Sequence, residues 1–264
     1  MNHAPDRLTK DGARPGTKRM TTVGIIIARA GSKGLANKNL RELGGKPLLV
    51  WTIEHALGSR RIDHVVLSSD SAAALELGLR HGIQTYSRPA ELAEDHVTID
   101  TAARHGAESW AQQHERTCDT AAILYGNVAI RPRDLTDRAL AKLIETGADS
   151  VQSVFPVGKM HPLWMRQLGG ETGDLLQMYQ PNRVYRRQDL PPLYMLNGGV
   201  IALRWQSLFT VDPAEPHAFL GYDRRAIVTQ AHDVIDIDSE LDLQMAEVLV
   251  QERAAQGKRL AASG

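Results

Sequence analysis

Apolar residues along the chain follow two kinds of pattern, which alternate over most of its length. Short continuous runs such as Val23–Ala28 and Ala121–Tyr125 are typical of strands buried on both faces. Between the runs, apolar residues recur every three or four positions, as in Pro47–Leu57, which predicts helices. Strands are expected at residues 23–28, 64–69, 83–86, 121–125, 149–155, 199–203 and 233–237, and helices at 47–57, 71–81, 100–114, 134–146 and 239–251. This order predicts an α/β fold with a parallel sheet covered by helices on both faces.

The alternation stops between Pro156 and Asn197. That stretch contains Gly169-Gly170 and several prolines and shows little periodicity. It is too long for a plain loop in a compact domain. We therefore expect an inserted hairpin or arm at about residues 157–196, of the kind that serves as a subunit interface or a lid.

Polar segments flank the patterned region. Residues 1–21 carry five Lys or Arg residues but no apolar stretch of the length that a signal peptide needs. We expect a flexible leader there, with a tag remnant or a misassigned start as alternatives. The folded domain is expected over residues 22–250 and a small polar tail over residues 251–264.

The charges of the chain balance, because 31 Lys and Arg residues face 31 Asp and Glu residues. A zero net charge gives no global attraction to nucleic acid or to an anionic membrane, so any anionic partner must be met by a local cluster. The apolar runs are far shorter than the ~20 residues that span a bilayer. The lone Cys118 excludes an intrachain disulfide and a cysteine-based zinc cluster. We expect a cytoplasmic protein without a nucleic-acid or membrane partner.

A glycine-rich loop follows the first predicted strand. Gly31 and Gly34 let the backbone turn sharply and bring its N–H groups near a ligand. Arg29, Lys33 and Lys38 supply three positive charges within ten residues. Ligands of open α/β sheets bind at the carboxyl ends of strands, where this loop lies. The loop lacks the P-loop and dinucleotide-binding spacings, so its pattern favours a triphosphate cradle of another kind, with a plain loop bearing surface lysines as the alternative.

The same loop resembles the N-terminal signature of the CMP-sugar synthetases, which include the CMP-sialic acid, CMP-pseudaminic acid and CMP-KDO cytidylyltransferases. The family form P-A-R-x-G-S-K-x-(I/L)-x-x-K-N matches Ala28–Asn39, with Ile27 in place of the usual proline. Gly45–Leu48 resembles the family's G-K-P-(L/M) helix start. Further segments resemble family motifs in the family's order, at residues 68–71 (SSDS), 88–95 (RPAELAED), 187–191 (RQDLP), 197–199 (NGG) and 236–238 (DID). The resemblance covers roughly residues 22–250.

The resemblance implies a fold and an activity. The fold is a Rossmann-like nucleotidyltransferase three-layer sandwich with a mostly parallel sheet and an inserted dimerisation arm. The activity is transfer of CMP from CTP to the anomeric hydroxyl of an acidic 2-keto-3-deoxy sugar, a sialic acid-like nonulosonate, with release of pyrophosphate. The implied cofactor is Mg²⁺, and the implied assembly is a homodimer that exchanges arms.

The resemblance also assigns roles to individual residues. By this resemblance, Arg29, Lys33 and Lys38 would neutralise the triphosphate during catalysis. Asn39 and Arg88 would contact the cytosine. The other binding residues it implies are Ala28, Gly31 and Ser32 in the loop, Thr98 at the ribose, Arg187 at the sugar carboxylate, and Asn197. For Arg187, a salt bridge with Asp189 or a plain surface position is the alternative.

Asp236 and Asp238 stand one residue apart at the end of the last predicted strand. Strand alternation would point both carboxylates to the same face, where they repel unless a cation or a proton comes between them. Mg²⁺ prefers carboxylates together with phosphate oxygens and water, so the pair is a candidate metal site. The alternative is capping of the last helix, a role that also suits Ser239 and can coexist with metal binding. Asn127 stands where the CMP-KDO enzymes carry a further metal aspartate and offers only a neutral oxygen.

Three positions depart from the pattern of the sialic acid enzymes. Met195 stands where arginine is usual, Ile201 where tyrosine is common, and Trp164 where a lysine can occur. The acceptor pocket is therefore expected to be less polar, which favours a deoxy or acylated nonulosonate unless another residue supplies the same contacts. A different acceptor such as a phosphonate, and a non-catalytic nucleotide-binding homologue, are the alternative functions.

Overall fold

The centre of the molecule is a seven-stranded sheet in the order β11-β7-β10-β6-β1-β4-β5. It is seen in a computed structural model that describes residues 20–31 and 34–262 of the chain. The strands are β1 (Thr22–Ala28), β4 (His64–Ser69), β5 (Gln84–Ser87), β6 (Thr120–Tyr125), β7 (Ser150–Pro156), β10 (Tyr194–Arg204) and β11 (Arg224–Val228). Neighbours are parallel, except that β10 is antiparallel to both β6 and β7. The predicted α/β fold with a mostly parallel sheet is confirmed.

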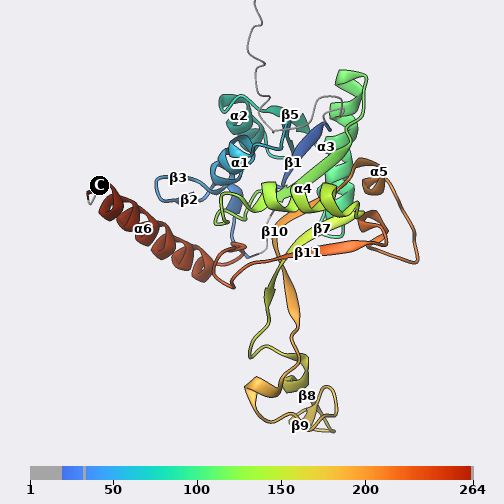
Figure 1. Ribbon diagram of the computed structural model, residues 1–264, viewed down its shortest axis with the longest axis vertical. Coiled ribbons are helices and arrows are strands. Elements are labelled where there is room, and N and C mark those ends of the chain that lie inside the picture. The colour runs from blue at the N-terminus through green and yellow to red at the C-terminus, as the bar shows by residue number, and fades with distance from the viewer. Residues whose placement is uncertain (1–19, 32–33, 263–264) are drawn as a thin grey trace, which may run out of the picture.

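Helices cover both faces of this sheet and complete the three layers (Figure 1). They are α1 (Leu48–Gly58), α2 (Ala72–Arg80), α3 (Ile99–His114), α4 (Leu135–Thr146) and α5 (Trp205–Leu208), whereas α6 (Glu240–Ala262) projects away from the body. One buried cluster joins the sheet to α1, α2 and α4, and a second joins it to α3 and α5. Consecutive β1 residues enter opposite clusters, Ile25 the second and Ile26 the first, because side chains alternate along a strand. Burial of apolar surface on both faces is the main force that holds the layers together.

One predicted strand is not formed, and the predicted end of one helix is wrong. Asp233–Ile237 is not a strand, since only Ile235 pairs there, in an isolated bridge with Ile130. The last helix does not end at residue 251 but continues as α6 to Ala262, so most of the expected polar tail is helical. The residues beyond 251 are rich in Ala, Gln, Arg and Leu, which are good helix formers.

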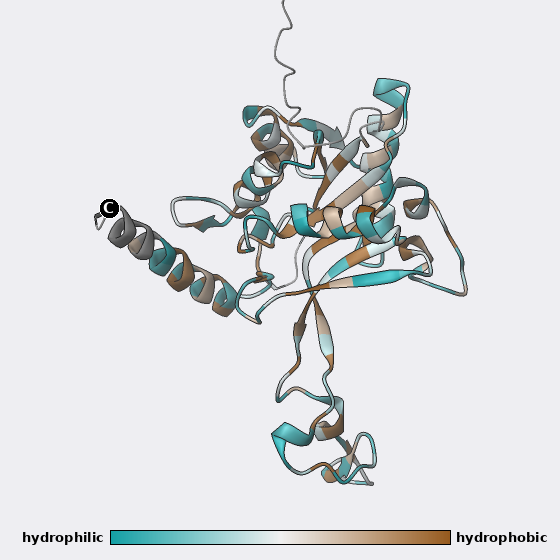
Figure 2. Ribbon diagram, viewed as in Figure 1, coloured by the Kyte–Doolittle hydropathy of each residue, from teal (hydrophilic) through white to brown (hydrophobic). Residues whose placement is uncertain are grey.

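Strand β11 is absent from the predicted elements. It pairs in parallel with β7 at the edge of the sheet and begins with Arg224 and Arg225. Figure 2 shows this strand as a hydrophilic segment beside the apolar central strands. Edge strands tolerate charged residues because one side of the strand has no neighbour. The apolar pattern used to find the other strands therefore does not reveal it.

Between β7 and β10 the chain leaves the body and forms a long arm (Figure 1). The two strands remain paired at the base of the arm, where Tyr194 lies opposite Pro156. Further out lie the short helices η3 (Pro162–Trp164) and η4 (Arg187–Asp189) and a hairpin of β8 (Arg166–Gly169) and β9 (Leu175–Met178). The proline-rich stretch of the sequence is thus an arm outside the sheet, as predicted.

A third buried cluster ties the C-terminal helix to the N-terminal half of the chain. Leu243 and Ala246 of α6 share it with Leu43 and Leu48, next to the small hairpin of β2 (Glu42–Leu43) and β3 (Lys46–Pro47). This packing brings the residues just before α6 against the loop that follows β1. No helix in the described part of the chain is long and apolar enough to cross a membrane.

Candidate active site

A cavity of about 300 Å³ opens at the carboxyl ends of β1 and β6. Ligands of open α/β sheets bind at this edge, beyond the strand ends. Residues from distant parts of the sequence line it, and those predicted as site residues are Ala28, Arg29, Lys38, Asn39, Arg88, Thr98, Asp236 and Asp238. The fold therefore brings the cation-rich loop and the C-terminal carboxylates to one place.

Two of the predicted cations in the wall have carboxylates beside them. Arg29 Nη1 lies 2.5 Å from Asp95 Oδ1, and Lys38 Nζ lies 2.5 Å from Asp238 Oδ1. Lys38 reaches the carboxylate from the start of the short helix η1 (Lys38–Leu40). Both ion pairs are at least partly open to solvent, where such pairs contribute little to stability. Their cations can therefore turn to an anionic ligand at small cost.

Asn39 and Arg88 lie buried in the same wall, and each has one polar atom without a partner. Asn39 Nδ2 donates to Arg29 O at 2.9 Å, and Arg88 Nη2 donates to Ala28 O at 3.2 Å. Within the described residues, Asn39 Oδ1 and Arg88 Nε have no hydrogen-bond partner. Buried polar atoms are normally paired. An unpaired acceptor and an unpaired donor in one cavity wall point to a polar ligand.

Asp70, at the end of β4, supports this wall. Its Oδ1 accepts from the backbone N–H of Ala30 at 2.8 Å and lies 3.8 Å from Arg88 Nη2. Burial lowers the pKa of Arg88, and the carboxylate of Asp70 opposes that shift. Asp70 thereby fixes the loop after β1 and keeps the buried guanidinium charged.

The carboxylates of Asp236 and Asp238 lie on the same side of their segment, as predicted, although the segment is not a strand. Asn127 Nδ2 donates to Oδ1 of both residues, at 3.3 Å in the case of Asp238. Loss of surrounding water, followed by the charge of Asp238, raises the pKa of Asp236 to about 6, although part of the residue remains exposed. The arrangement concentrates negative charge at a point that favours a cation.

Ser239 caps α6, as the sequence alternative proposed. Asp242 N donates to Ser239 Oγ at 3.3 Å, and Ser239 N donates to Asp242 Oδ2 at 2.8 Å, a reciprocal capping box. Asp242 Oδ2 also accepts from the backbone N–H of Asp238 at 3.2 Å. Capping by Ser239 therefore coexists with carboxylates that are directed into the cavity, and it fixes the backbone beside them.

A second cavity of about 410 Å³ adjoins the first, and Tyr125 and Asp236 line both. Asn197 lines it from a bulge in β10, where the register with β7 shifts. Gly198, with φ of 68°, forms this bulge, and a Cβ there would come within 3.0 Å of the Tyr125 ring. Much of the remaining wall is apolar and includes Ile201. The pair of cavities can hold two reactants that meet beside Asp236.

Some predicted residues lie elsewhere or cannot be placed. Gly31 belongs to the loop but does not line the cavity, whereas Thr98 lines it from the start of α3. Ser32 and Lys33 lie outside the described residues.

Arg187 lies in η4 on the arm and lines neither cavity. The proposed salt bridge with Asp189 is formed by its neighbour, since Arg186 Nε lies 2.8 Å from Asp189 Oδ2. The guanidinium of Arg187 is thus not held by that carboxylate.

Asp95 and Tyr125 are among the wall residues that were not selected as site residues from the sequence. Asp95 is the last residue of the motif at residues 88–95, so the sequence had already indicated this segment as part of the site. Tyr125 is the last residue of β6, and its place at a central strand end was the available signal. Burial raises its pKa, so the phenol stays protonated and can act only as a neutral hydrogen-bonding group.

A cation-rich loop and a carboxylate pair lie together at the carboxyl edge of a mostly parallel sheet, an arrangement expected of a nucleotidyltransferase. The sequence model of the cytidylyltransferase family matches residues 23–184. The chain belongs to the cytidylyltransferase family.

Curated relatives that span the chain act on several acidic sugars. CMP-N,N'-diacetyllegionaminic acid synthase of Legionella pneumophila is 29% identical over 245 residues, which cover 88% of this chain and 97% of the relative. Pseudaminic acid cytidylyltransferase of Campylobacter jejuni is 27% identical over 236 residues, covering 87% and 96%. N-acylneuraminate cytidylyltransferase of Streptococcus agalactiae is 32% identical over 199 residues, covering 72% of this chain but 46% of the relative. The chain thus spans about half the length of that streptococcal protein.

Solved structures with the same fold include two kinds of cytidylyl-transferring enzyme. CMP:2-keto-3-deoxy-manno-octonic acid synthetase, complexed with CTP, matches with a TM-score of 0.64 and 16% identity over 88% of this chain and 99% of its own. 4-Diphosphocytidyl-2C-methyl-D-erythritol synthase matches with a TM-score of 0.59 and 14% identity over 89% and 100%. At these identities the likeness supports the nucleotidyltransferase fold alone.

Proposed function

We propose that the protein transfers CMP from CTP to the anomeric hydroxyl of a nonulosonate, an acidic 2-keto-3-deoxy sugar, and releases pyrophosphate. The observation that carries the proposal is the first cavity, in which triphosphate-type cations, unpaired base-recognition groups and a carboxylate pair meet. The printed activities of the legionaminic, pseudaminic and acylneuraminate relatives support this class of acceptor. The proposed location is the cytoplasm, where CTP is made.

The unpaired atoms in the wall suit the polar edge of cytosine. That edge presents an amino donor and ring acceptors. Asn39 Oδ1 can accept from the amino group, and Arg88 Nε can donate to a ring acceptor, which leaves no buried polar atom of the pair unsatisfied. Thr98, at the opening of the cavity, is proposed to contact the ribose.

The triphosphate is proposed to lie along the loop after β1. Arg29 and Lys38 supply charge from the described part of this loop, and Lys33 is proposed to add a third cation. Backbone groups of Ala28, Gly31 and Ser32 would complete the cradle. Phosphoryl transfer is catalysed mainly by such positioning and charge neutralisation.

The residues at the carboxylate pair fit a Mg²⁺ ion. Asp236 and Asp238 offer two hard oxygen ligands on one side, and Lys38 Nζ already stands against Asp238 as a cation would. No group of three or more His, Cys, Asp or Glu side chains gathers at a metal-binding distance in the described chain, so phosphate oxygens and water would complete the shell. A rotation of the Asn127 amide would present its oxygen as well. When bound, the ion lowers the charge on the reacting phosphate and the pKa of a coordinated hydroxyl.

The acceptor is proposed to occupy the second cavity. Its largely apolar wall suits deoxy or acylated positions of the sugar, and Asn197 can bond a polar substituent. Asp236 lines both cavities and stands between the two reactants. Arg187 is proposed to bind the sugar carboxylate across a homodimer, because the arm that carries it projects from its own body (Figure 1).

The function is tested by pyrophosphate release from CTP in the presence of Mg²⁺ and a panel of legionaminic, pseudaminic and sialic acids. We expect release with a deoxy, acylated nonulosonate and a fall of about 100-fold in Asp236→Asn, which removes one charge from the pair. Arg61→Ala, an exposed arginine outside both cavities, serves as the control. Pyrophosphate release with a phosphonate but with none of the sugar acids would show that the acceptor is not a nonulosonate. Tight CTP binding without pyrophosphate release for any acid would refute catalysis.

A further inference from the structure

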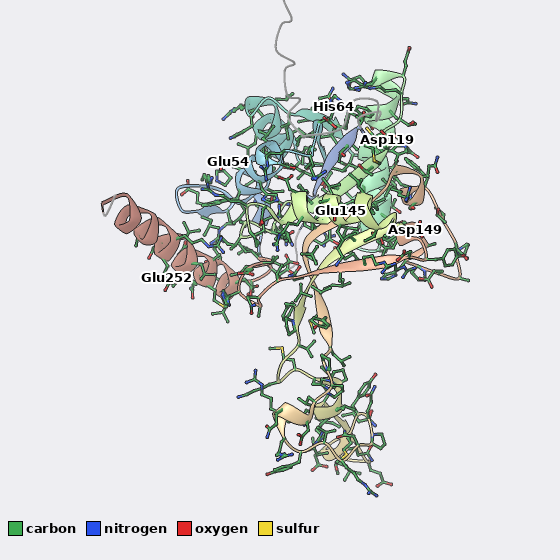
Figure 3. All side chains as sticks on the ribbon, in the orientation of Figure 1. Glu54, His64, Asp119, Glu145, Asp149 and Glu252 are labelled. Atoms are coloured by element: carbon green, nitrogen blue, oxygen red, sulfur yellow. The ribbon has the colours of Figure 1, made fainter. Side chains whose placement is uncertain are left out.

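A third cavity, of about 620 Å³, lies between α1, the segment after β6, and α6. It shares no lining residue with the two cavities of the proposed active site. Glu54 on α1 lines it, and Figure 3 labels this residue together with Glu252 on α6, the helix that forms the opposite wall. The complete lining is Lys46, Trp51, Glu54, His55, Gly58, Ala129, Ile130, Arg131, Arg133, Val250 and Arg253. Four of these side chains are permanent cations and one is a carboxylate.

Arg131 is the unusual member of this lining, because its guanidinium is buried and forms no ion pair within the described part of the chain. The residue is 5% exposed. Its Nη2 donates to Tyr125 O at 3.3 Å, while Nε and Nη1 have no hydrogen-bond partner among the described residues. Burial lowers its pKa to about 9, with Asp236 opposing the shift from a distance. A buried, incompletely paired charge is costly unless a partner of opposite charge completes it.

The other charges of the cavity add to this positive potential. Glu54 forms an ion pair with Lys46, so that carboxylate is already engaged. Arg133 and Arg253 are exposed at the cavity from opposite sides, and neither is held in an ion pair within the described chain. Three guanidinium groups therefore line a space whose one carboxylate among the described lining residues, Glu54, is paired with Lys46.

The apolar part of the wall limits what kind of anion fits. Trp51 presents an indole ring, and Ile130 and Val250 present aliphatic surface. The ammonium group of Lys46 lies over the indole ring of Trp51, with Nζ 3.8 Å from the ring centre. The cavity is roomier than an inorganic anion needs, which leaves space for an organic group beside the ring.

We propose that this cavity is a separate binding site for a small phosphate monoester. Its phosphoryl group would be held by Arg131, Arg133 and Arg253, since guanidinium groups pair with phosphate oxygens in a fork geometry. Its organic part would lie against Trp51. The site is independent of the proposed acceptor, because no residue of the third cavity takes part in the assignment of CTP or sugar.

The test is isothermal titration calorimetry of the full chain with inorganic phosphate and with phenyl phosphate at constant ionic strength. We expect saturable binding of both, with phenyl phosphate tighter by about threefold to tenfold through its contact with Trp51. In Arg133→Ala/Arg253→Ala, which alters exposed side chains only, affinity for both probes should fall about tenfold or more.

Two control variants make the result decisive. Arg61→Ala/Arg166→Ala removes two exposed arginines elsewhere and should leave binding unchanged. Lys38→Met weakens anion binding in the proposed active site and should also leave it unchanged. The proposal fails if wild-type protein shows no saturable binding, if both arginine pairs weaken it equally, or if only Lys38→Met removes it. None of these outcomes depends on catalytic activity.

Discussion

At the scale of single residues, Thr52 holds the turn that follows β6 against α1. It lies on α1 with no exposed surface, and its Oγ1 lies 3.1 Å from both Tyr125 O and Val128 O. These carbonyls belong to the turn that carries Asn127 beneath the carboxylate pair. A single hydroxyl thus connects the helix to the turn after β6.

Thr52→Val should destabilise the protein by about 1–2 kcal/mol, because the isosteric side chain removes the donor and leaves buried carbonyls less well paired. Urea unfolding gives the free energy of unfolding. Thr146→Val is the matched control, since that hydroxyl bonds Lys142 O within an exposed helix turn. An equal loss of unfolding free energy in the two variants would show that the bonds of Thr52 to the turn contribute no more to stability than a hydroxyl bond within an exposed helix turn.

His55 provides a pH dependence of stability. Burial, followed by the charge of Arg131, lowers its pKa from 6.5 to about 3. The unfolded chain therefore binds a proton below pH 6.5 that the folded chain refuses, and stability falls as the pH drops from 6.5 towards 3. From pH 7 to pH 5 the loss from this residue should be about 2 kcal/mol.

The measurement is urea unfolding of wild type and His55→Gln at both pH values. The variant should lose less stability on acidification than the wild type. His232→Gln, at an exposed histidine, should leave the wild-type pH dependence in place. If His55→Gln loses as much stability as the wild type between pH 7 and pH 5, groups other than His55 cause the pH dependence.

At the scale of elements, the sequence revealed those parts whose pattern is local. β4 has the predicted bounds and β1 differs by one residue, because continuous apolar runs are sufficient to identify buried strands. The apolar pattern did not predict β11, because its arginines are tolerated at a sheet edge. Residues 233–237 are largely apolar, as in a strand, yet within the described chain they pair only through the bridge at Ile235. A strand depends on its partner, which the local pattern does not contain.

The candidate site, like the fold, could be predicted where its residues lie close together in the sequence and not where they lie far apart. The loop from Ala28 to Asn39 could be identified from its motif, because its glycines and cations lie close together in sequence. The contacts of Asn127 with the carboxylate pair and of Arg29 with Asp95 join residues far apart in the chain. Such pairings follow from the order of strands in the sheet, which no single segment encodes.

Gly34 marks the point where the loop after β1 touches the segment before α6. A Cβ at this position would lie 2.3 Å from Asp238 O. Gly34→Ala should push the two segments apart and lower the rate of pyrophosphate release about 10-fold to 100-fold, because small displacements of reacting groups are costly. The rate is measured in the assay with CTP and the accepted sugar.

Gly58→Ala is the matched control, because a Cβ there has no heavy atom within 4 Å. It should retain the wild-type rate. A Gly34→Ala enzyme with unchanged activity would mean that the contact with Asp238 O does not position the carboxylates.

At the scale of the whole molecule, the arm exposes more apolar surface than an isolated chain should carry. Leu168 and Leu176 lie opposite each other in the β8–β9 hairpin and are 68% and 65% exposed. Other exposed apolar residues of the arm include Met160, Leu175, Met178, Tyr179, Tyr185 and Leu196. Contiguous apolar patches of this kind mark protein interfaces, which supports the proposed homodimer.

Leu168→Lys/Leu176→Lys should convert a dimer into a monomer, because the paired charges would face the partner subunit. Sedimentation velocity at micromolar concentration gives the oligomeric state. Gln167→Lys/Gln177→Lys places the same charges on the other face of the same hairpin, where residues 167 and 177 are paired, and should leave the dimer intact. A wild-type protein that sediments as a monomer would contradict the arm interface.

The ion pair between Lys38 and Asp238 joins residues 200 positions apart. During synthesis the ribosome must therefore release nearly the entire chain before the carboxylates can reach the loop after β1. All seven strands of the central sheet precede Asp236 in the chain. The carboxylates of the proposed site are thus synthesised after every strand of the central sheet, so the site is the last part of the described fold to be completed.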